Sequence, residues 1–256
     1  ITVVTKQNSL TQGSIFKALF RLALPIMGTS FVQMAYNMTD MIWVGRIGTR
    51  AVASVGTAGF FSWLAMAFIL IPKIGAEVGV AQSVGRQDMA EAKVYIKHSI
   101  QMIVFLALAY ASILIIFRKP LIGFFNLKEA DIVNDAITYL VIVSLGMVFF
   151  FINPVFSAIF NGYGESRTPF VVNSIGLVIN MILDPLLILG LGPFPRMEVA
   201  GAAIATILAQ AAVTTIFLIV AMGKTKLFSG LSLLKAPDTE HIKKITKLGL
   251  PVALQS

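Results

Sequence analysis

Residues 96–117 read IKHSIQMIVFLALAYASILIIF and hold one lysine, Lys97, with no arginine or acid, in 22 positions. About 20 apolar residues in a helix cross the roughly 30 Å hydrocarbon core of a bilayer. A strand of a membrane β-barrel needs only about ten residues, and its side chains alternate between apolar and polar. This long, continuous run therefore predicts a membrane-spanning helix rather than a barrel strand.

Five more apolar runs of comparable or greater length surround this one. Together the six predicted spans cover residues 15–43, 51–74, 96–117, 132–160, 169–191 and 198–222. Short polar segments separate them, as turns at the two membrane surfaces require. The sequence thus predicts an all-α polytopic membrane protein in which residues 1–222 form a lobe of six transmembrane helices.

The composition of the whole chain agrees with a membrane location. Hydrophobic residues make up 57% of the 256 residues and charged residues 12%, with a mean hydropathy of +0.86. By comparison, about a quarter of a soluble domain is charged. These values exclude a soluble enzyme, a disordered linker and a nucleic-acid-binding domain, despite the net charge of +8. The chain has no cysteine and no P-loop, HExxH or GxSxG motif, so we expect neither an enzyme nor a cofactor.

Lysine and arginine predict the orientation, because they are more frequent in cytoplasmic loops. With a cytoplasmic N-terminus, fourteen of the 20 lie on the cytoplasmic side of the six spans and six lie on the other side. The predicted location is therefore the inner (plasma) membrane of a cell, crossed several times, with the N-terminus inside.

The end of the chain resembles its beginning. Shifting residues 16–30 by 226 positions superposes Lys17 on Lys243, Leu22 on Leu248, Pro25 on Pro251 and Ser30 on Ser256. Chance similarity between two helix starts is one explanation, and an internal repeat, as found in transporters built from two halves, is the other. The repeat predicts that residues 223–241 are a cytoplasmic linker between two lobes, and that residues 242–256 begin helix seven of a longer protein.

Two carboxylic acids lie inside predicted spans, Asp40 in the first and Asp184 in the fifth. An acid at the centre of a membrane helix costs about 2.5–3.5 kcal/mol on insertion scales. Such residues normally face the interior of the bundle, where they pair with other polar groups or bind protons, ions or substrates.

Both acids belong to polar stripes at helical spacing. Gln33, Tyr36, Asn37 and Asp40 share one face of the first span, and Asn173, Asn180 and Asp184 share one face of the fifth. Pro185 leaves the Met181 carbonyl without its helical donor, which adds an oxygen suited to a proton or Na⁺ beside this second stripe. The alternative is a polar patch that only ties helices together.

Elsewhere, Tyr139 is an interfacial anchor or a site residue, and Asn153 marks a kink with Pro154 or lines a cavity.

Short motifs along the whole chain resemble those of multidrug and toxic compound extrusion (MATE) transporters. In chain order they are Leu22–Pro25 (LALP), Asp40 followed by Val44–Gly48 (VGRIG), Ala51–Gly56 (AVASVG), Gly79–Gly85 (GVAQSVG), Asn161–Pro169 (NGYGESRTP), Asn180–Pro185 (NMILDP) and Gly201–Thr206 (GAAIAT). Each is weak alone, but their number and order are specific. The first polar stripe and the Asn180–Asp184 pair are most similar to the prokaryotic branch related to DNA-damage-inducible protein F.

The resemblance implies a twelve-helix transporter made of two six-helix lobes, of which this chain is the N-lobe with the start of helix seven. The implied cation-binding residues are Asp40, Asn180 and Asp184, which would bind H⁺ or act as metal ligands to Na⁺, with Thr206 as a fourth unless Ala202 takes that place. The residues implied to line the drug cavity are Gln33, Tyr36, Asn37, Tyr139 and Asn153, and the implied hinge of the first helix is Pro25.

The implied function is export of organic cations and other amphipathic drugs in exchange for H⁺ or Na⁺ by alternating access. Expected partners are these drugs, membrane lipids and the C-lobe of the same transporter, with no nucleic acid. One alternative is a lipid-linked oligosaccharide flippase of the same superfamily, which would need a more basic cavity to hold pyrophosphate. The other is a membrane scaffold, which would have no reason to keep two acids inside its spans.

Overall fold

The computed structural model describes residues 15–223 and 238–255, and the regular structure of these residues is entirely helical. The helices are α2 (Ile15–Gly45), α3 (Thr49–Gly85), α4 (Met89–Ile116), α5 (Arg118–Gly123), α6 (Ala130–Leu145), α7 (Met147–Gly162), α8 (Arg167–Ile188), α9 (Glu198–Met222) and α10 (Thr239–Ala253). The all-α prediction is confirmed. Of the predicted linker, residues 224–237 lie outside the described residues.

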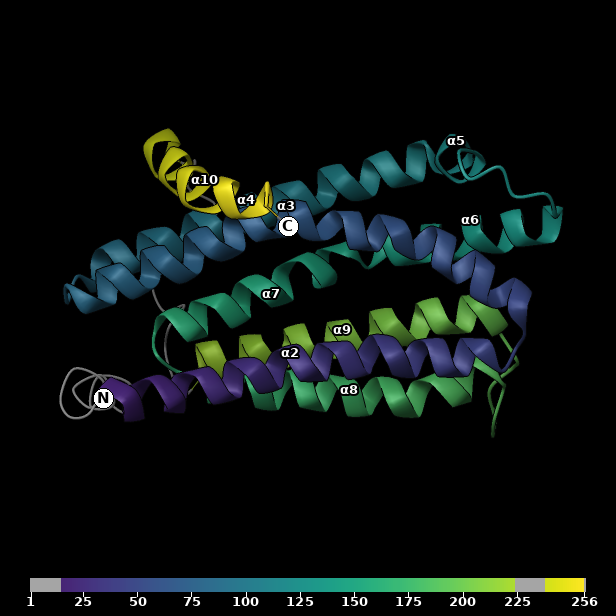
Figure 1. Cartoon of the computed structure of the whole chain (residues 1–256), viewed down its shortest axis with the longest axis horizontal. Coiled ribbons are helices and arrows are strands. Elements are labelled where there is room, and N and C mark those ends of the chain that lie inside the picture. The colour runs from purple at the N-terminus through teal and green to yellow at the C-terminus, as the bar shows by residue number, and fades with distance from the viewer. Residues whose placement is uncertain (1–14, 224–237, 256) are drawn as a thin grey trace.

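The long helices form two groups joined by a bent pair (Figure 1). Helices α2, α8 and α9 pack on one another in one group, and α3 packs on α4 in the other. Helices α6 and α7 lie between the groups, and both contact α3 and α9. The largest fully buried side chains include Phe151, Phe156 and Phe160 of α7 with Phe217 of α9, so the bent pair forms the core that holds the two groups together.

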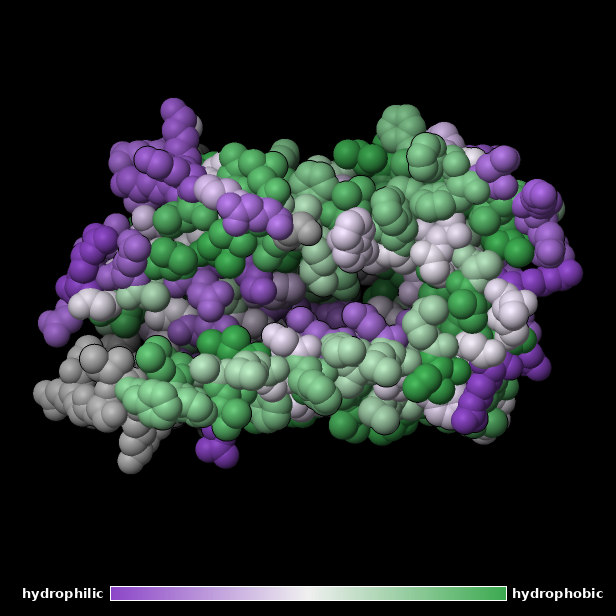
Figure 2. All heavy atoms as spheres, in the orientation of Figure 1, coloured by the Kyte–Doolittle hydropathy of each residue, from purple (hydrophilic) through white to green (hydrophobic). Residues whose placement is uncertain are grey.

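Membrane-crossing length and hydropathy are found in most of these helices. Within the described ranges, α3, α4, α8 and α9 are each long and apolar enough to span a bilayer, and the α6–α7 pair adds a fifth span if it is counted as one. Helix α2 has the length, at 31 residues, but polar side chains such as Gln33 and Asn37 lower its hydropathy. Figure 2 shows apolar side chains over both groups of helices in this view. Hydrophilic atoms are concentrated near the two ends of the molecule and around a central hollow.

Two helices extend beyond the predicted spans. The helix that contains the run 51–74 continues to Gly85, because its less apolar end packs on other helices, with Gly75 against Ile245 of α10 and Gly79 against Tyr95 of α4. The run 96–117 begins earlier, at Met89, where the Asp88 carboxylate accepts a hydrogen bond from the Glu91 backbone N–H at 2.9 Å and caps the helix.

The run 132–160 is not one straight helix. It breaks at Gly146 into α6 and α7, which are bent by 52° relative to each other. At Gly146 an added Cβ would overlap the Ile207 side chain of α9, so only glycine allows this close approach. The bend therefore lies at Gly146, and the predicted kink site at Pro154 is inside α7.

The last helix, α10, packs on α3 and α4 and begins three residues earlier than the predicted range 242–256. Its N-cap is Asp238, whose side chain accepts a hydrogen bond from the Glu240 backbone N–H at 3.1 Å. The hydrogen bonds from His241 and from this N–H hold the pKa of the Asp238 carboxyl below its usual range. The Asp238 backbone N–H in turn donates to Nε2 of His98 on α4 at 2.9 Å, which fastens the start of α10 to the lobe.

Replacing Gly201 by alanine is expected to destabilise the α8–α9 pair. An added Cβ would lie 2.5 Å from the Leu187 carbonyl oxygen and 2.6 Å from its carbon, and these backbone atoms cannot move aside without separating the helices. We expect a cost of about 1–3 kcal/mol, as for other overpacked sites. The measurement is thermal unfolding of the purified full-length protein in detergent.

Gly56→Ala is the matched control, since Gly56 is also helical but has no atom within 4 Å of an added Cβ. Alanine is up to about 1 kcal/mol better than glycine inside a helix, so this variant should be as stable as the wild type or slightly more stable. Equal melting temperatures for the two variants would contradict the packing argument.

Candidate functional site

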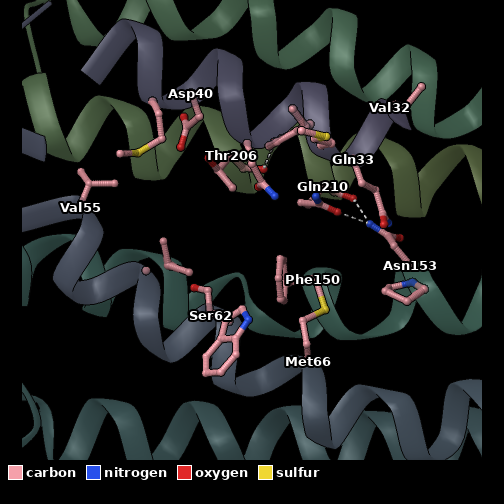
Figure 3. Close-up of a pocket in the computed structure, with 18 of the residues that line it drawn as sticks. Val32, Gln33, Asp40, Val55, Ser62, Met66, Phe150, Asn153, Thr206 and Gln210 are labelled. Atoms are coloured by element: carbon pink, nitrogen blue, oxygen red, sulfur yellow. Dashed lines mark hydrogen bonds between the residues drawn. The ribbon is translucent and has the colours of Figure 1, made fainter. Parts of the chain in front are cut away.

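The central hollow opens into a cavity of about 450 Å³ between the two groups of helices (Figure 3). Its wall is built by α2, α3, α6, α7, α8 and α9. Aromatic and thioether side chains make up much of the surface, among them Met34, Met66, Trp63, Tyr139 and Phe150. A space of this size, mostly apolar with a few polar groups, is typical of a small-molecule binding site.

Asp40 of α2 is the single charged side chain among the described residues that line the cavity. It is 9% exposed, and its Oδ1 atom has no hydrogen-bond partner within the described chain. A buried charge is costly unless it is paired, and none of the ion pairs described between side chains includes Asp40. The cavity wall therefore offers a carboxyl group that a proton or an entering cation can neutralise.

A second acid lies beside the cavity rather than on its wall. Asp184 and Asn180 of α8 are both 0% exposed, and the Asn180 amide donates to Asp184 Oδ1 at 3.0 Å. This hydrogen bond fixes the amide with its oxygen turned away from Asp184 Oδ1. Asp184 is also close enough to Asp40 for their charges to repel.

At this part of the wall and just behind it, four buried oxygens have no hydrogen-bond partner among the described residues: Asp40 Oδ1, Asn180 Oδ1, Asp184 Oδ2 and Thr206 Oγ1. Buried polar atoms are normally hydrogen-bonded, so each such atom calls for an explanation. Because no lysine or arginine forms an ion pair with either acid in the described ranges, a proton or a small cation is the simplest way to balance them. Nowhere in these ranges do three or more His, Asp or Glu side chains gather as a metal-binding cluster.

Tyr36 connects the two acids to α9. Its hydroxyl donates to the Thr206 carbonyl oxygen at 3.3 Å and interacts electrostatically with the carboxyl groups of both Asp40 and Asp184. The structure thus brings Asp40, Tyr36 and Thr206 to one part of the wall, with Asp184 behind it. Figure 3 shows Asp40 and Thr206 projecting from neighbouring helices at this end of the cavity.

The residues predicted for the drug cavity all lie on its wall: Gln33, Tyr36, Asn37, Tyr139 and Asn153. Asn173 of the second polar stripe lines it as well. Pro25 is outside it, within the unbroken helix α2. Their roles in binding, coupling and bending stay predictions, since position alone tests none of them.

Gln210 of α9 is a cavity residue that the sequence reasoning missed. A signal was present, because Thr206, Gln210 and Thr214 follow one another at intervals of four and so share one face of the predicted sixth span. A neutral glutamine in a mostly apolar run is a weaker signal of function than an acid, because an uncharged amide costs less to place inside a membrane. Its partner in space, Asn153, is on another helix and could not be read from the run itself.

Comparisons with known proteins agree with this architecture. The family model described as MatE matches residues 25–186. The probable multidrug resistance protein NorM of Thermotoga maritima is 30% identical over 245 residues, which cover 94% of this chain and 52% of that protein. A protein of Shewanella oneidensis named FAD transporter is 28% identical over 208 residues, covering 78% of this chain and 44% of that protein.

A solved structure of a MATE protein, described as being in the bent conformation, superposes with a TM-score of 0.85 at 27% identity. The superposition covers 96% of this chain and 54% of that one. This chain therefore spans about half the length of the relatives it matches.

Proposed function

This chain belongs to the MatE family of membrane transporters, and from that membership we propose that it forms the N-lobe of an antiporter that exports amphipathic organic cations in exchange for H⁺ or Na⁺. The observation that supports this most is the pair of buried acids without a basic partner, one on the cavity wall and one behind it. Multidrug relatives and the fold support the transport role.

The two acids provide a physical basis for exchange. Asp40 faces the cavity, so an organic cation can neutralise it, while Asp184 and Asn180 are shielded from the cavity and suit a proton or Na⁺. The negative charges of the two acids repel each other. When a positive ion neutralises one acid, the other therefore binds its own positive ion less tightly. Linked binding of this kind amounts to about 1–3 kcal/mol, enough for one ligand to displace the other.

Helix α2 is the element we propose to move. Pro25 lies inside it and cannot donate a backbone hydrogen bond, so the helix is easier to bend there. The Pro25 carbonyl accepts a hydrogen bond from the Thr29 hydroxyl at 3.0 Å, one turn later. Solved structures of similar MATE proteins are described as being in a bent and in a straight conformation, so proteins with this fold change shape.

We further propose an inner-membrane location with a cytoplasmic N-terminus, and a C-lobe that begins with α10. Large apolar side chains of α2, such as Phe20, Leu24, Met27 and Phe31, are exposed. Exposed apolar side chains of this kind are unfavourable in water, so we propose that lipid or the second lobe covers them. In this arrangement the linker of residues 223–241 joins the two lobes on the cytoplasmic side.

Anionic substrates are a weaker fit to this cavity. FAD, which the Shewanella oneidensis relative is named for, carries phosphates, and a pyrophosphate-linked lipid does too. Neither lysine nor arginine is among the described residues that line the cavity, whereas Asp40 is. An anion would therefore be repelled where an organic cation is attracted.

Full-length transporter in liposomes tests the proposal. Under an imposed pH gradient or an imposed Na⁺ gradient, a fluorescent organic cation should accumulate on the side from which the ion flows out, and the gradient that works identifies the coupling ion. Empty liposomes are the control. Equal distribution of the cation under both gradients would reject export of organic cations by ion exchange.

A further inference from the structure

Gln210 and Asn153 form a two-point contact on the cavity wall. The Asn153 amide nitrogen lies 3.0 Å from the Gln210 carbonyl oxygen and 2.7 Å from the Gln210 side-chain oxygen. On its other side, Asn153 Oδ1 accepts a hydrogen bond from the Thr214 hydroxyl at 2.7 Å. Asn153 is only 3% exposed, so these contacts are shielded from water.

The Gln210 backbone carbonyl determines how the side-chain amides of Asn153 and Gln210 are oriented. A backbone carbonyl can only accept hydrogen bonds, so the Asn153 atom facing the Gln210 carbonyl must be its NH₂ group. The Gln210 side-chain atom that faces the same NH₂ group must then be oxygen. It follows that the NH₂ group of Gln210 is the end turned away from Asn153, as Figure 3 shows.

The free end of Gln210 is therefore a hydrogen-bond donor. Its NH₂ group carries two hydrogens, and Tyr36 is the nearby side chain that can take one of them. The Tyr36 hydroxyl hydrogen is directed at the Thr206 carbonyl, so its oxygen can accept. The second hydrogen of Gln210 remains for a ligand in the cavity that Gln210 lines.

We propose that Gln210 is a specificity-determining residue, which selects among organic cations those that carry a hydrogen-bond acceptor such as a carbonyl oxygen. This inference rests on the proposed function, since Asp40 is taken to hold the positive charge. The substrate class it defines is an amphipathic cation with an acceptor group apart from the charge. Cations without an acceptor bind at the same site but leave the Gln210 donor unpaired, which is unfavourable away from water.

Two probes that differ only in the acceptor test this. They are the 4-phenylbutyltrimethylammonium ion and its 4-oxo derivative, which has a ketone next to the ring. The full-length transporter in lipid nanodiscs should bind the ketone more tightly, by about five- to tenfold, the value of one hydrogen bond of about 1 kcal/mol or slightly more. Binding is measured by calorimetry, so the result does not depend on coupling to an ion.

Gln210→Met keeps the length of the side chain but removes the amide, and it should lower the ratio of the two affinities to about one. Asn153 keeps the Gln210 backbone carbonyl as an acceptor, so the variant should fold, and Gln210→Leu is a second apolar replacement with the same expected result. Asn173→Leu is the matched control. It also removes a cavity amide, but the Asn173 NH₂ group already donates to the Pro169 carbonyl at 2.7 Å and to the Ser157 hydroxyl at 3.3 Å.

The ratio should therefore stay at its wild-type value in Asn173→Leu. A ratio near one in the wild type, or an unchanged ratio in both Gln210 variants, would overturn the role of Gln210. Neither outcome would affect the proposed function, which fails separately if bound probes are not exported in liposomes. Failure of the wild type to bind either probe would overturn both.

Discussion

Asp184→Asn is expected to abolish ion-coupled export while organic cations still bind. Asparagine has the shape of aspartate and can still accept the Asn180 hydrogen bond, which now measures 3.0 Å. It cannot exchange a proton or balance a cation. Asp184 is absent from the residues that line the cavity, so the drug contacts remain.

The effect should appear as a loss of accumulation. In liposomes the wild type should concentrate a fluorescent cation. With Asp184→Asn, the ratio of the probe concentration inside to that outside should fall to about one. The coupling that is lost, about 1–3 kcal/mol, corresponds to roughly 5- to 150-fold in affinity. The purified variant should still bind the same probe, with the affinity of a wild type whose Asp184 is neutralised by the coupling ion.

Asp131→Asn is the control for this substitution. Asp131 carries the same functional group, but its side chain is 80% exposed and lies 3.8 Å from Arg50 at the surface. Exposed pairs of this kind contribute little, so accumulation should match the wild type. Wild-type accumulation by a correctly inserted Asp184→Asn variant would refute the role of Asp184.

Asp40→Asn should weaken binding and export together. Asp40 is the charged group on the described wall of the cavity, so a bound cation loses its counter-charge. An interaction with a charged group contributes about 1.5–3 kcal/mol, which predicts an affinity for organic cations lower by roughly 10- to 150-fold. The measurement is calorimetry with 4-phenylbutyltrimethylammonium on full-length protein.

A neutral probe of the same shape, (5,5-dimethylhexyl)benzene, separates charge from packing. It has a carbon in place of the ammonium nitrogen, so its weak binding should be the same in the wild type and in Asp40→Asn. The two aspartate variants thus differ in a defined way, because only Asp40 is predicted to be needed for binding itself. Equal affinity for the ammonium probe in both variants and the wild type would contradict this division.

The helices of this protein could be predicted well because a membrane allows few alternatives. A segment inside lipid must satisfy its own backbone hydrogen bonds, so a long apolar run has to be a helix. Polar side chains then stand out, and Asp40 and Asp184 were found by their depth alone. Their burial in the structure agrees with inward-facing stripes.

The apolar runs alone could not predict the features that depend on contacts between helices. The break lies at Gly146, which packs against Ile207 of α9, a residue far away in the sequence. The Gln210–Asn153 contact joins residues 57 positions apart, so neither residue predicts it. Helix ends such as Gly85 extend beyond the apolar run, because hydropathy marks the membrane and not the end of a helix.

Ion movement driven by the drug is the most direct test of exchange. Full-length transporter in liposomes would be given a gradient of an organic cation with no gradient of H⁺ or Na⁺, and the pH and the Na⁺ concentration inside would be recorded. We predict that inward movement of the cation drives one of these ions outward in the wild type, and that Asp184→Asn shows no such movement. Entry of the cation through the wild-type protein without outward movement of either ion would contradict the central claim.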